Sequence, residues 1–158
     1  MERYAGLSYE QAVRKYADSV TKICRVHLDN PADAEDCFQN TFIKLYTKSP
    51  EFNDEEHLKA WLLRVAINEC KSCSRANRRR LSLSQPAAFA PSTEDASDIS
   101  WALTLVEFRY RQVLYLHYCE RYKVDEIASI LGKNKNTVKS MLSRGRERLR
   151  KIYGGDNR

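Results

Sequence analysis

A cluster of basic residues near the end of the chain is the feature best suited to bind another molecule. Residues 133–153 contain eight lysines and arginines and a single acid, Glu147, so this segment has a net charge of +7 in a chain whose total is +6. It could be a solvated helix face, a helix on a membrane surface, or an element that lies along nucleic-acid phosphates. Residues 64–80 form a second basic segment, with a net charge of +5.

The cysteines and histidines indicate neither a metal site nor an enzyme. Cys70 and Cys73 form a C-x-x-C pair, but they are one helical turn apart and no second pair at zinc-finger spacing follows them. The three histidines show no ligand spacing, and no nucleophile, histidine and acid form a catalytic set. We therefore expect no catalytic residues, no metal and no cofactor.

The cysteine count and the hydropathy pattern also bear on location. Five cysteines in a chain without an N-terminal export signal predict reduced thiols in the cytoplasm. No stretch of eighteen apolar residues occurs, so we expect no insertion into a membrane.

Capping residues predict two helices in the first fifty residues. Ser8 and Gln11 form a capping box that opens a helix over about residues 9–27. Asn30 as N-cap and Pro31 at the first helical position open a second helix. Its expected buried stripe comprises Ala34, Cys37, Phe38, Thr41, Phe42, Leu45 and Tyr46.

A third helix is predicted to begin with Asn53 and Glu56 as caps and to become basic toward its end. Its inward-facing residues are expected to be Leu58, Trp61, Leu62, Val65 and Ala66. Trp61 could stack on a nucleic-acid base, but its place in this stripe favours core packing. Phe52, in the preceding loop, is the better candidate for an exposed ring.

The composition changes at residue 81. Residues 81–98 contain two prolines and no basic residue, which is typical of a flexible linker. The helical pattern resumes at Ile99. The sequence thus predicts an all-α protein with two small helical domains, residues 1–80 and 99–158, joined by a linker over 81–98.

Residues 124–149 have the spacing of a helix-turn-helix. Ala128 is the small residue where two helices cross, Gly132 lies at the turn, and Val138 faces back from a second helix capped by Asn134. The apolar residues Ile127, Leu142 and Leu149 complete this core. The residues left on the outer face are Asn136, Thr137, Lys139, Ser140, Ser143 and Arg144. This spacing favours DNA binding in a major groove over a solvated or membrane-bound basic helix.

Three segments, in this order, resemble the extracytoplasmic-function (ECF) sigma factors, minimal two-domain promoter-recognition subunits of bacterial RNA polymerase. The resemblance covers about residues 8–80 and 99–153. "ADAEDCFQNTFIKLY" is similar to the segment that docks on the polymerase β′ clamp helices, and "HLKAWLLRVAINECKSCSRANRRR" resembles the helix that melts and reads the −10 element. "YRQVLYLHYCERYKVDEIASILGKNKNTVKSMLSRGRERLRK" is similar to the domain that reads the −35 element.

The resemblance implies partners and site residues. Core RNA polymerase would contact Asp36, Gln39 and Phe42. Asn68 matches the residue that contacts a flipped −10 base, with Arg64, Lys71, Arg75 and Arg78 placed on the same face for phosphates. In the −35 domain, Lys139, Ser140 and Arg144 match groove-facing positions, and Arg148, one turn further, is expected to contact a phosphate. Promoter DNA and an anti-sigma factor are the other implied partners.

The chain departs from the family pattern at four places. Asn40 stands where a second acid is usual and Met141 where an arginine is frequent, while Glu107 replaces a proline and Lys123 replaces a serine cap. Two alternatives stay open: a helix-turn-helix regulator that binds duplex DNA without polymerase, and a sigma-like interaction protein that does not specify promoters.

Overall fold

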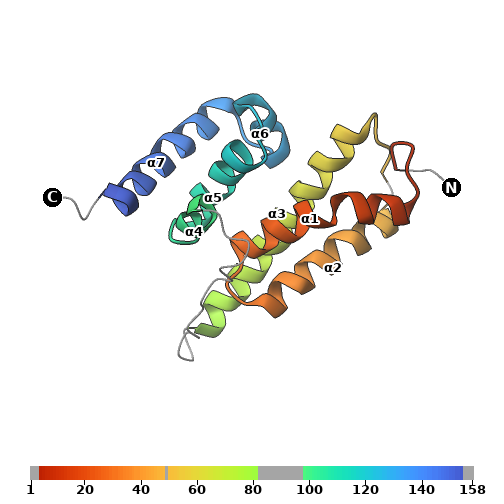
Figure 1. The fold of residues 1–158 in the computed structure, drawn as a ribbon, viewed down its shortest axis with the longest axis horizontal. Helices are drawn as coiled ribbons and strands as arrows, with labels where there is room; N and C mark the ends of the chain where they lie inside the picture. The colour runs from red at the N-terminus through yellow and green to blue at the C-terminus, as the bar shows by residue number, and fades with distance from the viewer. Residues whose placement is uncertain (1–3, 49, 82–97, 155–158) are drawn as a thin grey trace. The chain divides into compact units, whose positions relative to one another are not determined.

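The computed structural model describes residues 4–48, 50–81 and 98–154, and in these ranges every named element is helical (Figure 1). The chain divides into two compact units, Met1–Phe89 and Ala90–Arg158. The predicted all-α class with two helical domains is confirmed. The predicted flexible linker falls almost entirely on residues 82–97, outside the described residues.

The N-terminal unit contains three helices: α1 (Tyr9–His27), α2 (Pro31–Lys48) and α3 (Glu55–Leu81). The first two begin as predicted. The Ser8 hydroxyl accepts a hydrogen bond from the Gln11 amide at 3.1 Å, and the Gln11 side chain accepts one from the Ser8 amide at 2.9 Å. The Asn30 side chain accepts the amide of Ala32 at 2.8 Å, which fixes the first turn of α2.

The start of α3 differs from the prediction. Asp54, not Asn53, supplies the cap, because its carboxylate accepts the His57 amide at 2.8 Å. The Asn53 amide instead donates to the imidazole of His57 at 3.1 Å. An aspartate is as good an N-cap as asparagine, so these adjacent residues compete and local sequence does not choose between them.

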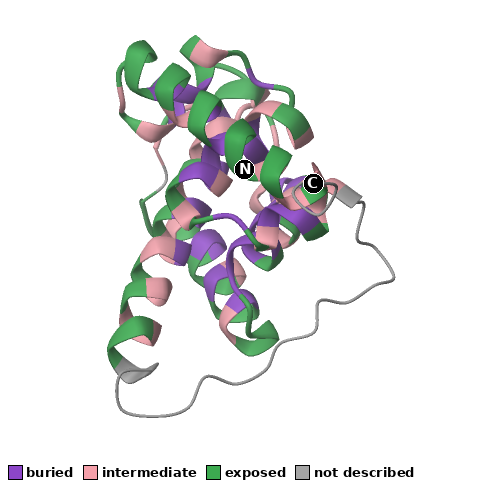
Figure 2. Ribbon diagram, turned by 90° about the vertical axis from the view of Figure 1, so that its left-hand side faces the viewer, coloured by how far each residue is buried: buried purple, intermediate pink, exposed green. Residues whose placement is uncertain are grey.

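The core of the N-terminal unit lies where the three helices face one another (Figure 2). Its fully buried large side chains are Ile23, Leu45, Leu58, Leu62, Leu63 and Ile67. Leu63 and Ile67 were not in the expected stripe of α3. Trp61 and Val65 were expected there but are only half-buried. The buried face of α3 is therefore turned by about one residue from the predicted one.

The C-terminal unit begins with two short helices separated by a break. The predicted helical segment from Ile99 is divided into α4 (Asp98–Thr104) and α5 (Phe108–Leu114). Glu107 is the N-cap residue of α5, but its side chain makes no capping hydrogen bond. The Arg111 guanidinium donates instead to the carbonyls of Thr104 and Val106, at 3.1 and 2.7 Å, and so satisfies acceptors in the break.

The helix-turn-helix follows as predicted, with α6 (Val124–Leu131) and α7 (Lys135–Gly154). Gly132 ends α6 in the left-handed conformation, with φ of 67°, which a glycine adopts without steric cost. The Asn134 side chain accepts the Thr137 amide at 2.8 Å and caps α7. The predicted core residues Ala128, Val138, Ile127 and Leu142 are all buried, whereas Leu149 is half-buried.

A wide helical turn, the π-helix η1 (Tyr115–Cys119), continues directly from α5. The Glu120 amide donates to the Tyr115 carbonyl at 3.2 Å, an i→i+5 bond that holds one residue more than an α-turn. The chain then leaves the helix, and the Tyr122 amide donates to the Leu116 carbonyl at 2.9 Å.

Helices α5 and α7 pack closely at Gly145. This glycine is buried, and a Cβ atom built on it would lie 2.9 Å from Cδ1 and 3.1 Å from Cγ of Leu114. Leu114 is itself fully buried, so it has little room to move. A glycine in the middle of a helix is explained here by the close approach of its neighbour rather than by backbone conformation.

Enlarging Gly145 is therefore expected to destabilise the C-terminal unit. Gly145→Val should cost about 1–3 kcal/mol, because it adds side-chain atoms to a filled core. Urea unfolding can be followed through Trp101 fluorescence in a Trp61→Phe background, in which the remaining tryptophan reports on the C-terminal unit. Gly154→Val is the matched control, because nothing lies within 4 Å of a Cβ at that position. Equal unfolding midpoints for the two variants would show that Leu114 accommodates the change.

Candidate nucleic-acid interface

The predicted −10 residues lie along one face of α3. Positions 64, 68, 71, 75 and 78 follow one another at steps of three or four, which keeps them on the same side of a helix. Arg64, Asn68, Arg75 and Arg78 are exposed, and Lys71 is half-buried. The structure thus brings all five residues together on an accessible surface.

The single acid in this part of α3 does not neutralise that face. Glu69 is half-buried and forms an ion pair with Lys44 of α2. This pair connects the two helices and already satisfies the Glu69 carboxylate. The arginine and lysine side chains of the α3 face therefore retain a net positive charge with which to attract phosphates.

The two candidate stacking rings contact each other. Phe52 and Trp61 are both half-buried, with ring centroids 5.7 Å apart in an edge-to-face arrangement. Phe52 also lies edge-on to the His57 ring at 5.3 Å. The sequence predicted that Trp61 packs in the core and that the Phe52 ring is exposed. Both predictions are only partly confirmed, because the two half-buried rings form one aromatic cluster beside the start of α3.

On α2 the predicted polymerase contacts separate into two kinds. Asp36 and Gln39 are exposed. Phe42 is only 4% exposed, and its ring packs against that of Phe38 with centroids 5.0 Å apart. The assignment of Phe42 as a surface contact is corrected on this ground, because a side chain in the core cannot meet a partner without moving. Its carbonyl is also occupied, accepting the Tyr9 hydroxyl at 2.8 Å.

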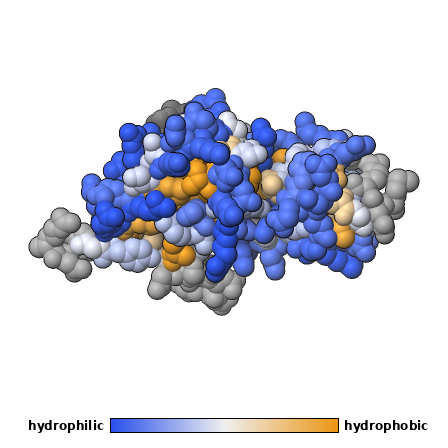
Figure 3. Space-filling view, turned by 90° about the horizontal axis from the view of Figure 1, so that it is seen from above, coloured by the Kyte–Doolittle hydropathy of each residue, from blue (hydrophilic) through white to orange (hydrophobic). Residues whose placement is uncertain are grey.

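Two apolar residues on α2 were missed as surface residues. Ile43 is 54% exposed and Tyr46 is 64% exposed, although Tyr46 was expected in the buried stripe. With Asp36 and Gln39 they follow steps of three and four, so the four residues share one outward face. The sequence signal for Ile43 was its position between Phe42 and Leu45, off the buried stripe. Figure 3 shows one face of the molecule, which is mostly hydrophilic and carries several apolar patches.

The outer face of α7 has the predicted composition. Its exposed residues are Asn136, Thr137, Lys139, Ser140, Ser143 and Arg144. Val138 and Leu142 hold the opposite side of the helix in the core. An α-helix fixed in this way can present its N-terminal half to the edges of base pairs in a major groove.

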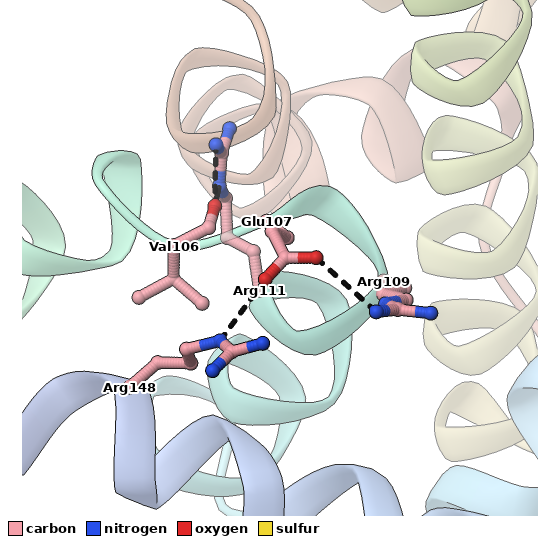
Figure 4. Close-up of polar contacts among 5 residues, drawn as sticks. All are labelled: Val106, Glu107, Arg109, Arg111 and Arg148. Carbon is pink, nitrogen blue, oxygen red and sulfur yellow. Dashed lines mark hydrogen bonds and ion pairs between the residues drawn. The ribbon is translucent and has the colours of Figure 1, made fainter.

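Arg148 lies in a network that the sequence did not predict (Figure 4). Its Nε donates to Glu107 Oε1 at 3.0 Å, while Arg109 Nη2 donates to Glu107 Oε2 at 3.3 Å. The guanidinium groups of Arg148 and Arg109 also lie 5.6 and 4.8 Å from the centroid of the Tyr110 ring. Residues Arg109, Tyr110, Arg144, Glu147 and Arg148 line an open hollow of about 400 Å³. Arg148 is exposed, but a phosphate must compete with Glu107 for it.

Neither a metal centre nor a membrane span is found in the part of the chain that the structure describes. There, histidine, cysteine, aspartate and glutamate side chains form no group that could hold a metal ion. No helix within the described ranges combines the length and apolar character that crossing a bilayer requires.

Comparison with known families accounts for both units. Residues 12–80 match sigma-70 region 2, and residues 102–149 match sigma-70 region 4. The ECF RNA polymerase sigma factor SigW of Bacillus subtilis is 29% identical over 164 residues, which cover 91% of this chain and 88% of SigW. The chain is an ECF sigma factor.

Other sigma factors are similarly related over most of their length. The RNA polymerase sigma-E factor of Streptomyces avermitilis is 29% identical over 150 residues, which cover 91% of this chain and 84% of that protein. The sigma factor RpoE of Bartonella quintana, solved in complex with the anti-sigma factor NepR, has a TM-score of 0.75 at 25% identity and covers 92% of this chain and 96% of RpoE. CnrH, solved with the cytosolic domain of CnrY, shares the fold, with a TM-score of 0.68 at 20% identity, over 94% of this chain and 88% of CnrH.

Membership of this family gives the function at the level of the whole protein. A sigma factor is a non-catalytic subunit that binds core RNA polymerase and DNA and directs promoter recognition. The open alternative of a regulator that acts without polymerase is thereby set aside. The absence of a catalytic set in the sequence agrees with this role, because the polymerase itself joins the nucleotides.

Proposed function

We propose that this sigma factor divides promoter recognition among three helices. The exposed face of α2 binds the β′ clamp helices of core polymerase, the basic face of α3 melts and reads the −10 element, and α7 reads the −35 element. The corresponding domains are residues 1–80 and 99–158, joined by a linker over 81–98. The observation that carries this proposal is the exposure of the α3 and α7 residues while the opposite sides of both helices are buried.

The proposed polymerase face combines two polar and two apolar residues. Asp36 and Gln39 offer hydrogen-bond acceptors and a negative charge. Ile43 and Tyr46 extend the same face with exposed apolar surface, and the Tyr46 ring is held edge-on against Tyr9 at 5.2 Å. Aromatic and aliphatic anchors beside hydrogen-bonding groups are typical of the residues that contribute most to protein interfaces.

Promoter melting would use the charge and the amide on α3. Extruding a base from a duplex costs a few kcal/mol, which the enzyme complex must offset. Arg64, Arg75 and Arg78 can hold the backbone of the displaced strand, because each phosphate contact releases counterions. The Asn68 amide has both donors and an acceptor, so it can pair with the edge of a flipped base.

The −35 element would be read by α7 from its capped end. The Asn134 cap places the N-terminal turns of α7 outside the core of the C-terminal unit, where Asn136 and Lys139 are exposed. Arg144, two turns along the helix, is the residue best suited to contact a guanine edge bidentately. Arg148 would contact a phosphate in exchange for Glu107.

Two further proposals concern the setting in which the protein works. We place it in the cytoplasm, where its polymerase is. We also propose an anti-sigma factor as a regulatory partner, supported by the likeness to RpoE, which was solved with NepR. Co-purification of the tagged chain from its own host would identify such a partner.

Run-off transcription with purified core polymerase tests the division of work directly. A promoter-specific transcript is expected only when the chain is added, and substitutions in the −10 or −35 element should each reduce it. Adding the chain without any gain of a specific transcript would favour a sigma-like interaction protein. A transcript that is unchanged by substitutions in one element would remove the corresponding helix from promoter reading.

Polymerase docking is expected to depend on the exposed polar pair of α2. The double change Asp36→Ala and Gln39→Ala should weaken binding to core polymerase about tenfold or more, corresponding to about 1.4 kcal/mol or more. The physical reason is the loss of a charge and of hydrogen bonds that face the partner. Equilibrium binding of a fluorescently labelled chain to core polymerase measures the change.

The control for this prediction is Asp18→Ala, which removes an exposed acid from α1 rather than α2. Helicity should be the same in both variants, since none of the three residues is buried. Core affinity that is equal in the double variant and the control would remove α2 as the docking face.

A further inference from the structure

Four of the five cysteines gather in the N-terminal unit. Cys24 comes from α1, Cys37 from α2, and Cys70 and Cys73 from α3. None of the cysteines forms a disulfide in this structure. The C-x-x-C pair is therefore half of a thiol cluster that joins all three helices, a fact that only the tertiary fold reveals.

The thiols of this cluster contact one another in a row. The Cys70 thiol is within hydrogen-bonding reach of those of Cys24 and Cys37, and the Cys37 thiol also reaches that of Cys73. The order along the row is Cys24, Cys70, Cys37 and Cys73. A row of pairwise contacts differs from the closed shell of four ligands that zinc needs, in keeping with the lack of a metal-holding group among the described residues.

Cys73 is the end of the row that solvent reaches. It is half-buried, whereas Cys24, Cys37 and Cys70 are buried. The Asn77 amide donates to the Cys73 sulfur at 3.8 Å and to Asp33 Oδ2 at 3.1 Å. An oxidant arriving from solvent would thus meet Cys73 first, with the buried thiol of Cys37 directly behind it.

We propose that Cys37 and Cys73 form a reversible thiol–disulfide pair that is oxidised by hydroperoxides. Neither cysteine is among the residues proposed to contact DNA or polymerase. The bond would connect α2 to α3 covalently, at the place where Asn77 of α3 already joins Cys73 to Asp33 of α2, one turn before Cys37. It requires the two sulfurs to approach to about 2.05 Å.

The chemistry balances with hydrogen peroxide as the only added reactant. The Cys73 thiolate attacks one peroxide oxygen, so that an S–O bond forms, the O–O bond breaks and hydroxide leaves. The Cys37 thiolate then attacks the Cys73 sulfur, so that the S–S bond forms, the S–O bond breaks and a second hydroxide leaves. The two protons released by the thiols convert both hydroxides to water, and the two sulfurs together give two electrons to the peroxide.

The groups around the two sulfurs fit these roles and determine the rate of the first step. The pKa of Cys37 is lowered, chiefly by a hydrogen bond from Cys70, which favours the thiolate needed for the second step. Partial burial, reinforced by the Asp33 carboxylate and the Cys37 thiol facing it from α2, raises the pKa of Cys73 to about 11. The first step is therefore slow at pH 7, because few Cys73 side chains are ionised.

Burial excludes Cys70 from the reaction although it touches Cys37. Hydrogen bonding with the thiols of Cys24 and Cys37, together with burial, raises the pKa of Cys70 strongly. It remains a thiol that stabilises the neighbouring Cys37 thiolate as a hydrogen-bond donor. Cys24, at the far end of the row, is likewise buried away from oxidant.

Peptide mapping of the full-length chain tests the pairing. A lysine or arginine separates every successive pair of cysteines, so trypsin places each of the five in a different peptide. After treatment of the reduced protein with hydrogen peroxide, mass spectrometry without reductant should detect the Cys37 peptide linked to the Cys73 peptide. Thiol titration should show the loss of two thiols per chain, and dithiothreitol should restore both.

Cysteine-to-serine variants and the pH dependence of the initial rate show whether the link is specific to Cys37 and Cys73. Cys73→Ser, at a half-buried position, should reduce the cross-linked product at least tenfold without unfolding the unit, while Cys119→Ser in the other unit should leave it unchanged. The initial rate should rise about tenfold from pH 7 to pH 8, because the Cys73 thiolate fraction rises by that factor below its pKa. Loss of thiols without the linked peptides, a link through Cys119 or between chains, or a rate that does not depend on pH would each overturn the proposal.

Discussion

Replacing Asn68 with alanine is expected to reduce open-complex formation on a double-stranded promoter by about five- to 150-fold, corresponding to about 1–3 kcal/mol. Asn68 is exposed on the basic face of α3, so the substitution removes no core contact. Alanine also favours a helix more than asparagine does, so the thermal stability should not fall. Permanganate footprinting of the −10 region measures melting, and base substitutions there should show relaxed preference at one position.

A promoter whose −10 region is already open shows whether the defect of Asn68→Ala arises during strand separation or has another cause. If Asn68 stabilises a flipped base during melting, the defect should shrink on a promoter with a mismatched −10 bubble, where strand separation costs less. Glu56→Ala, an exposed change three turns earlier on α3, serves as the control. Normal melting of the duplex promoter by Asn68→Ala, or a matching loss of thermal stability, would remove Asn68 from the reading face.

The second large effect is expected at Arg144. Loss of a base-reading side chain should cost about 1–3 kcal/mol and relax specificity at one −35 position. Arg144 is exposed on α7, and Leu142 in the core fixes the helix so that Arg144 cannot turn inward. The measurement is binding of the holoenzyme carrying Arg144→Ala to promoters with each −35 base substituted. Unchanged affinity and preference across that series would show that other residues of α7 meet the bases.

Arg148 serves as the comparison with Arg144, because we expect it to contact a phosphate rather than a base. Its guanidinium is paired with the Glu107 carboxylate. Arg148→Ala should weaken all sequences alike and flatten the salt dependence by about one unit of slope. Glu107→Gln should act in the opposite direction, since it frees Arg148 and Arg109 from a carboxylate that occupies the place of a phosphate. The ion pair itself is exposed and contributes little to stability, so both variants should unfold like the parent protein.

Local chemistry made several elements predictable from sequence. The capping box of Ser8 and Gln11 and the Asn30 cap each involve residues two or three apart, so their partners can be read directly from the chain. The turn at Gly132 is predictable for the same reason, because only a glycine adopts the left-handed conformation without cost. The outer face of α7 followed from helical spacing, whereas the −10 residues of α3 followed from the resemblance to the sigma family.

Residues whose burial depends on neighbouring helices were harder to predict. Phe42 and Tyr46 are both aromatic and one turn apart on α2, yet Phe42 is buried and Tyr46 exposed. Helical spacing gives the direction of a face but not how wide a strip the neighbours cover. The same limit explains why Leu63 was missed on α3.

Contacts between residues far apart in the chain lay beyond sequence reasoning. Glu107 and Arg148 are 41 positions apart, and nothing in their spacing indicates that one holds the other. Cys37 and Cys73 are likewise brought together only by the packing of α2 on α3. The C-x-x-C pair was interpreted as two residues of a helix, which is correct, but its neighbours come from the other two helices.

The wide turn at Tyr115–Cys119 has a consequence for how chain length can vary in this unit. Each residue of an α-helix advances the chain by about 100°, so deleting one from α5 would rotate everything after it and misdirect the recognition helix. Within the π-helix, the same deletion would convert an i→i+5 bond into an ordinary i→i+4 bond and leave the flanking residues in register. Relatives without this turn should therefore align with a one-residue gap at Tyr115–Cys119, which is the point where evolution can lengthen or shorten the unit without moving its DNA-reading surface.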